Sequence, residues 1–256
     1  MHVKAYANRG TIYYKLGQLT EAISDFDKAI ALEPSKTMAL INRGIAKRGK
    51  GMLPQAILDF DKAAAVSPNN PAIYSNRGAI YAILNDNEQA IRDYQKALSI
   101  DANYALAHVS LGLALAAKSE PHLALESFTK AIGINPSYAQ AYNDRGYVYE
   151  DLQQFDLAIA DYTKAILYDP KYKEAYKNRA SAYMSKNKFD LAIDDLHQAL
   201  KIAPDYYQAL SNLGASYSQL GFYQKAKRQY ELALEINPNY ESARKNLDDL
   251  MHFLDK

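Results

Sequence analysis

Prolines recur along this chain at a constant interval, and that interval constrains the fold more than any other feature. Six of the nine prolines stand at positions 34, 68, 136, 170, 204 and 238, so every gap is 34 residues or twice 34. The one missing position of the series holds Ala102. Because proline lacks an N–H and restricts the residue before it, each proline predicts the end of a regular segment. The chain is therefore expected to repeat one 34-residue unit.

One copy, residues 139–172, shows what the unit is. Two successive segments carry apolar side chains at helical spacing, and the polar pair Gln153-Gln154 separates them: Tyr142, Tyr149 and Leu152 in the first, then Ala158, Tyr162, Ala165 and Ile166 in the second. Spacings of three, four and seven residues place such side chains on one stripe of a helix. The unit is predicted to be a helical hairpin, and the fold class is predicted to be all-α.

Seven such units align without a gap, and certain positions are almost constant. The twentieth and twenty-seventh residues are always alanine, as in Ala158 and Ala165. The eighth residue is small and the twenty-fourth is large: Gly10, Gly44, Gly78, Gly112, Gly146, Ala180 and Gly214, then Phe26, Phe60, Tyr94, Phe128, Tyr162, Leu196 and Tyr230. A mid-helix glycine costs about 0.5–1 kcal/mol relative to alanine. These glycines therefore predict a close approach of the two helices, with the large side chain filling the groove.

This pattern resembles the tetratricopeptide repeat, and the resemblance covers residues 3–240. The repeats would be 3–36, 37–70, 71–104, 105–138, 139–172, 173–206 and 207–240. The resemblance implies a right-handed superhelix whose concave face is lined by the first helix of each pair and binds ligands. Residues 241–256 resemble the amphipathic helix that commonly closes such arrays, with a partner-binding tail as the alternative.

Composition removes several other classes of function. The net charge of +1 with interspersed signs argues against a nucleic-acid or anionic-membrane surface. No run of 18 apolar residues is present, so no membrane insertion is expected. The absence of cysteine excludes disulfides and thiolate chemistry. We expect a cytoplasmic protein without cofactor or metal, although a periplasmic location is equally compatible with this composition.

The abrupt start of the first repeat, with Ile12 and Leu16 facing outward, suggests self-association or further residues upstream.

Arginine and aspartate vary together between the repeats. The five units with arginine at the seventh position have aspartate sixteen residues later, whereas the two with leucine, Leu111 and Leu213, have Ser127 and Gln229 there. This predicts an ion pair inside each hairpin: Arg9 with Asp25, Arg43 with Asp59, Arg77 with Asp93, Arg145 with Asp161 and Arg179 with Asp195.

Two repeats depart from the pattern. The second has Lys47 where the others have tyrosine or leucine, in a stretch Lys47-Arg48-Gly49-Lys50-Gly51 that is expected to be a solvated basic turn. In the fourth, His108 replaces an aromatic residue or leucine, and Ala102 replaces the preceding proline. That joint is expected to be looser, or its helix to run on by a turn.

The concave face can be projected from the family geometry. Its sixth position reads Asn8, Asn42, Asn76, Ser110, Asp144, Asn178 and Asn212. Because a side-chain amide offers both donors and an acceptor, such a row could hold the backbone of an extended peptide. It is similar to the asparagine ladder in the repeat domain of O-linked N-acetylglucosamine transferases. The alternative is that asparagine simply tolerates a polar groove.

The rest of that face is expected to carry an apolar strip and an acidic cluster. The strip comprises Met38, Ile41, Ile45, Ile83, Leu106, Val109 and Leu113; the cluster comprises Asp144, Tyr147, Glu150 and Asp151. An apolar patch rimmed by charge usually marks a binding site, although the cluster could be an ordinary solvated helix surface.

Two hypotheses of function follow. One is an adaptor that binds a peptide segment of a partner protein in its groove. The other is the substrate-targeting domain of a larger enzyme whose catalytic part lies outside this chain. The carboxylate clamp of co-chaperone repeats is absent, because the fifth position offers only Lys177, followed by Ser181 instead of asparagine. The five histidines form no metal-ligand motif and no catalytic motif is visible, so no enzymatic activity is expected.

Overall fold

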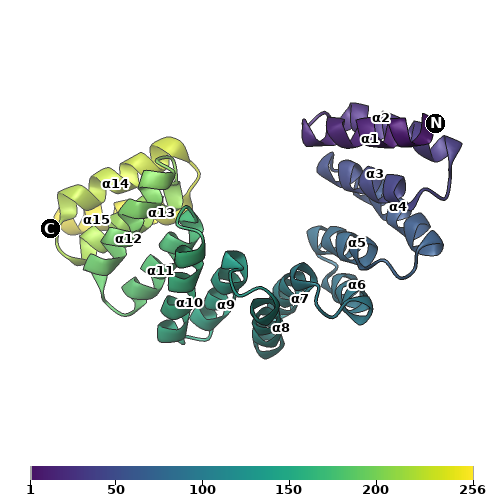
Figure 1. The fold of residues 1–256 in the computed structure, drawn as a ribbon. Coiled ribbons are helices and arrows are strands. Elements are labelled where there is room, and N and C mark those ends of the chain that lie inside the picture. Colours follow the sequence, from purple (N-terminus) through teal and green to yellow (C-terminus); the bar gives the residue numbers. More distant parts are fainter. Residues whose placement is uncertain (1, 256) are drawn as a thin grey trace. The chain divides into compact units, whose positions relative to one another are not determined.

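The computed structural model describes residues 2–255, and its regular elements in that range are fifteen α-helices, α1 to α15 (Figure 1). They fall into two compact units that divide between Ile134 and Asn135. The all-α class is confirmed. Within each unit every odd-numbered helix except α15 packs on the even-numbered helix that follows it, and short loops join consecutive helices. This is a solenoid of stacked helical hairpins.

The first unit contains eight helices. They are α1 (His2–Lys15), α2 (Leu19–Leu32), α3 (Thr37–Gly49), α4 (Leu53–Val66), α5 (Pro71–Ile83), α6 (Asn87–Ile100), α7 (Ala105–Ala117) and α8 (Pro121–Ile134). The odd-numbered helices also contact one another in sequence, α1 with α3, α3 with α5 and α5 with α7. The side chains of Ile12 on α1 and of Leu16, which directly follows α1, are exposed. Self-association through them stays a prediction.

The second unit contains seven helices. They are α9 (Ala139–Asp151), α10 (Phe155–Tyr168), α11 (Lys173–Ser185), α12 (Phe189–Ile202), α13 (Tyr207–Gln219), α14 (Tyr223–Ile236) and α15 (Glu241–Leu254). The odd-numbered helices are again neighbours, and α15 packs on both α13 and α14 through the buried Ala243 and Leu250. An amphipathic helix is therefore present where the sequence predicts one, whereas the division of the chain into seven repeats stays a prediction.

The turn inside each hairpin has one residue with a left-handed backbone. These residues are spaced by the repeat length: Gly17, Gly51, Asn85, Ser119, Gln153, Asn187 and Gly221. At Asn85 the N–H donates to the Ala82 carbonyl and the next N–H donates to the Tyr81 carbonyl. Such a pair of bonds ends a helix and reverses the chain, and glycine and asparagine favour the conformation that it needs. The predicted break at Gln153 is this turn.

The joint that lacks proline is neither looser nor longer than the others. Helix α6 ends at Ile100, and Asp101 has φ −135° and ψ 97°, close to the φ −134° and ψ 91° of Asp169, which precedes Pro170. His108 Nε2 lies 3.0 Å from the Ala102 carbonyl oxygen, and the Tyr74 hydroxyl donates to the Pro68 carbonyl at 3.0 Å in the preceding repeat. The expectation of a loosened or extended joint is wrong, because His108 contacts the backbone carbonyl at this joint as Tyr74 does at the preceding one.

Close packing of a glycine on an aromatic ring holds six of the hairpins together, whereas the hairpin of α11 and α12 has Ala180 and Leu196 at these positions. A Cβ atom added to Gly112 would lie 2.7 Å from the Phe128 ring, and one added to Gly146 would lie 2.9 Å from the Tyr162 ring. Both rings are fully buried. The predicted close approach is therefore confirmed, and it explains why these helices carry glycine despite its conformational cost.

The predicted ion pairs are also present. The arginine Nε and Nη2 atoms donate to the two oxygens of the aspartate in all five hairpins, as in Arg179 and Asp195, at 2.8 and 2.7 Å. Lys47 departs from expectation. Its Nζ lies 2.8 Å from an Asp59 oxygen and the side chain is largely buried, so it belongs to the ion pair of Arg43 and Asp59 and not to a solvated turn. Lys50 and Gly51 are exposed as expected.

Candidate functional site

The apolar residues predicted for the binding face of the first unit lie on α3, α5 and α7, which follow one another in a row (Figure 1). Four of them are exposed, and we call these four the apolar strip: Met38 on α3, Ile83 on α5, and Leu106 and Leu113 on α7. Ile45 is half-buried and borders a pocket of about 200 Å³. Large exposed side chains on neighbouring helices are available to a partner.

Two of the predicted residues are not available. Ile41 is 4% exposed and Val109 is 1% exposed, so the expectation that they line the surface is wrong. Both stand at the fifth position of a repeat, where Ser75 and Ser211 are also buried. Ile41 packs in the core with Phe60 of the partner helix. At these repeats the fifth position points into the stack, and a ligand on the surface cannot reach Ile41 or Val109.

The asparagines of the first unit differ in how much of their amide is free. Asn8 is exposed. Asn42 donates to the Thr11 hydroxyl at a long 3.4 Å. Asn76 donates to the Ala72 carbonyl at 2.8 Å and accepts from Arg48 at 3.3 Å, so both ends of its amide have partners.

In the second unit, Asn178 is buried and donates to the Asn143 oxygen at 2.9 Å. Asn143 in turn donates to Asp144 at 3.2 Å. Asn212 is half-buried. Asn76 and Asn178 thus make contacts inside the protein, so the asparagines of the sixth position do not form a uniform row of free amides. A peptide-binding role stays a prediction for Asn8, Asn42 and Asn212.

The predicted acidic cluster divides into bound and free groups. Both oxygens of Glu150 have partners, since one accepts from the Tyr162 hydroxyl at 2.8 Å and the other from the Ser181 hydroxyl at 2.7 Å. Tyr147 and Asp151 are exposed. Of the four predicted residues, these two are the ones that α9 presents to solvent.

The remaining member, Asp144, lies in an unusual environment. Its Oδ2 is buried and has no hydrogen-bond partner among the described residues. Burial raises the pKa of this carboxyl above its ordinary value, although the hydrogen bond from Asn143 acts in the opposite direction. Nearby on α11, burial lowers the pKa of the Lys177 ammonium, against the attraction of Glu150 and Glu174. Charge in this part of the second unit is poorly solvated.

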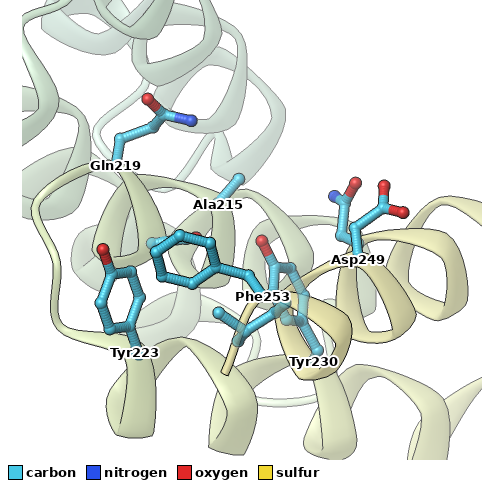
Figure 2. A pocket seen from close by; sticks show the side chains of 9 residues that line it. Ala215, Gln219, Tyr223, Tyr230, Asp249 and Phe253 are labelled. Carbon is cyan, nitrogen blue, oxygen red and sulfur yellow. The ribbon is translucent and has the colours of Figure 1, made fainter. Parts of the chain in front are cut away.

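A pocket between α13, α14 and α15 was not foreseen from the sequence. It has a volume of about 380 Å³, and Figure 2 shows the rings of Tyr223, Tyr230 and Phe253 with Gln219 and Asp249 around it. Burial raises the pKa of Tyr230 to about 12. The signal that could have revealed this pocket is the small size of the residues on α13 that face it, Ala215 and Ser218.

The described part of the chain has neither a cluster of metal ligands nor a membrane-spanning helix. Residues 2–255 contain no group of three or more histidine, aspartate or glutamate side chains placed to hold a metal ion. None of the described helices is long and apolar enough to cross a membrane.

Comparison with protein-family models identifies the repeat. The model described as "Tetratricopeptide repeat" matches residues 3–36, 139–172 and 174–206, and a second model of the same description matches 207–240. A model described as "TPR repeat" matches residues 80–119. Together these matches cover more than half of the chain. No curated protein matches it.

Solved structures with the same fold include three of different sizes. The chain aligns with the APC/C hetero-tetramer Cut9–Hcn1 at a TM-score of 0.79 and 19% identity, over 96% of this chain and 48% of that one. It therefore spans about half of that relative. A tetratricopeptide repeat protein from Parabacteroides merdae aligns at 0.74 and 20% identity, over 98% and 99%. YrrB aligns at 0.56 and 24% identity, over 72% and 95%. The repeat matches and the helical architecture together show that the chain belongs to the tetratricopeptide repeat family.

Proposed function

We propose that this protein binds a segment of a partner protein along its odd-numbered helices. Its family and fold make it a protein-interaction scaffold. YrrB, one of the similar structures, is described as a TPR protein with an unusual peptide-binding site, and we extend peptide binding to this chain as part of the proposal. We propose no catalytic activity for it. The targeting-domain alternative would use the same helices.

The observation that carries the proposal is the apolar strip. Met38, Ile83, Leu106 and Leu113 expose large apolar side chains on three neighbouring helices of one unit. Exposed apolar surface on adjacent elements favours association, because burying it against a partner removes it from water. In peptide complexes a few such buried anchors supply most of the binding energy.

In the second unit, α9 offers a different contact. Tyr147 presents an exposed ring and Asp151 an exposed carboxylate. An aromatic ring beside a carboxylate suits a lysine or arginine of a bound segment. Exposed charge of this kind contributes orientation and association rate more than affinity. A segment bound to the first unit would therefore carry apolar anchors, and a segment bound to the second unit would carry basic side chains.

The test selects peptides that bind the full chain by display and then measures their affinity by fluorescence anisotropy. The variant Leu106→Asp with Leu113→Asp should bind at least about tenfold more weakly, because a charge replaces each anchor contact. The matched control is Leu123→Asp on α8, because Leu123 is 50% exposed and Leu106 is 47% exposed. Circular dichroism checks that the variants stay folded.

Peptides that bind the α7 variant as tightly as the unchanged chain, but lose binding to Leu123→Asp, would place the interaction on the even-numbered helices. That result would overturn the proposal.

A further inference from the structure

The pocket between α13, α14 and α15 exists because short side chains face it. Two repeats earlier, the equivalent space between α9 and α11 is closed by Glu150, which accepts from both Tyr162 and Ser181. At the corresponding position α13 has Ser218, one turn from Ala215. These side chains are too short to reach across, and a pocket of about 380 Å³ remains above the Tyr230 ring. That volume lies within the range of about 300–1,000 Å³ typical of ligand sites.

The lining of this pocket combines aromatic rings with a single charge. The rings of Tyr223 and Phe253 pack with their centroids 5.2 Å apart, and both border the pocket (Figure 2). Gln219 and Asn246 add amides, and Asp249 is the one charged residue of the lining among the described residues. The complementary ligand group is therefore a cation that has hydrogen-bond donors and a flat face.

The chain already shows how it binds such a group. Arg179 lies over the rings of Tyr176 and Tyr183, each centroid 6.0 Å away, while its guanidinium binds the carboxylate of Asp195. The same arrangement of arginine, tyrosine ring and aspartate recurs at Arg9, Arg77 and Arg145. The pocket supplies rings and a carboxylate in the same way, but no arginine lines it among the residues that the structure describes.

We propose that this pocket is a subsite for an arginine side chain of the bound partner segment. The proposal rests on the proposed function, since it presumes that the chain binds such segments. The guanidinium would pack on the rings of Tyr223 and Phe253 and donate to Asp249. Arginine fits better than lysine, because its planar group has five donors and stacks on aromatic faces. An acidic side chain is disfavoured by the charge of Asp249.

The experiment titrates the isotope-labelled full chain with two blocked tripeptides and follows its NMR spectrum. One is acetyl-Gly-Arg-Gly-amide and the other carries citrulline, which has nearly the shape of arginine but no charge. The arginine peptide should shift resonances of α13 and α15 in a saturable manner. The citrulline peptide should bind at least about tenfold more weakly, because it loses the charge-assisted hydrogen bond.

Three variants locate the site. Asp249→Asn should weaken binding of the arginine peptide about tenfold, and Phe253→Ala should weaken it as well. Phe253 is largely exposed, so its removal leaves the fold intact. The matched control is Asp248→Asn, which removes a neighbouring exposed carboxylate that does not line the pocket and should change affinity less than about twofold. Equal binding of the two peptides, equal effects of the two aspartate variants, or shifts on other helices would each overturn the subsite.

The outcome is separable from that of the proposed function. If the arginine peptide fails while display-selected peptides still need Leu106 and Leu113, only the subsite is lost. If the arginine peptide behaves as expected while selected peptides ignore Leu106 and Leu113, the apolar strip is the wrong surface and the pocket remains.

Discussion

Arg77 and Asp93 form a two-pronged ion pair that joins α5 to α6. Nε donates to Oδ2 at 2.8 Å and Nη2 donates to Oδ1 at 2.7 Å. The third nitrogen, Nη1, donates at 2.6 Å to Asp61 on α4, in the preceding hairpin. Arg43 makes the equivalent contacts with Asp59 and Asp27. Each of these arginines therefore closes its own hairpin and fastens it to the one before.

The two carboxylates that bind Arg77 should differ in their effect on stability. The Asp93 side chain is almost buried, whereas that of Asp61 is nearly half exposed. Asp93→Ala leaves a largely buried guanidinium without its main partner and should lower the free energy of unfolding by about 3 kcal/mol. The matched change Asp61→Ala should cost about 0–1 kcal/mol, because water replaces an exposed partner. Urea unfolding followed by circular dichroism measures both, and equal losses would refute this division of roles.

Glycine substitutions provide a test of the close packing between helices. A Cβ at Gly112 would press on the buried Phe128 ring, so Gly112→Ala should destabilise the protein by about 1–3 kcal/mol despite the better helix propensity of alanine. Gly133 is the control, because it also lies in a helix and no atom stands within 4 Å of its added Cβ. Gly133→Ala should stabilise by up to about 1 kcal/mol. A stabilising Gly112→Ala would show that the ring can move aside.

Much of the fold was predictable because seven copies in one chain act as their own comparison. The ion pairs were visible because the seventh and twenty-third positions, which hold Arg43 and Asp59 in the second repeat, vary together from repeat to repeat. The glycine contacts were visible because every repeat combines a small eighth residue, such as Gly112, with a large twenty-fourth residue. The bridging contact of Arg43 to Asp27 was missed. Only Asp61 repeats the aspartate at that position, where the later repeats have Gln95, Thr129, Thr163, His197 and Glu231, so the regularity that revealed the other pairs is lacking.

The candidate site was less predictable, for a geometric reason. Helical spacing places Ile41 and Met38 on nearby parts of one helix, but it does not tell which of them meets the next helix of the stack. The structure buries Ile41 and exposes Met38. The pocket beside Asp249 exists because the side chains of Ala215 and Ser218 are small. A sequence motif is recognised by residues that are present, so it does not reveal a space that small residues leave open.

Asp144 should make stability depend on pH. Burial holds the pKa of Asp144 in the folded protein above the ordinary value of 3.8. At a pH between 3.8 and this raised pKa, the folded protein keeps a proton that the unfolded chain has lost. Stability therefore falls as pH rises through that window, and the full cost is present above it. Asp144→Asn removes the charge and should raise the free energy of unfolding by about 1 kcal/mol at neutral pH, with a smaller gain near pH 4.

Denaturation of both proteins at several pH values measures the difference between them. The control is Asp151→Asn, an exposed carboxylate on the same helix, which should change stability little at any pH. A gain from Asp144→Asn that is the same at acidic and neutral pH would show that removing the charge is not its cause.

Restoring proline at the joint before α7 should stabilise the protein. Asp101 already has the extended backbone found before proline at other joints, with φ −135° against −136° at Ser67, and Tyr104 donates to the Asp101 carbonyl as Asn70 does to Ser67. Because the folded conformation suits proline, Ala102→Pro mainly restricts the unfolded chain and should add about 0.4–1 kcal/mol to the free energy of unfolding. The reciprocal change Pro68→Ala, in the same unit, should remove a similar amount. Chemical denaturation compares the two, and a loss of stability in Ala102→Pro would mean that the backbone at residue 102 does not adopt the angle that proline requires.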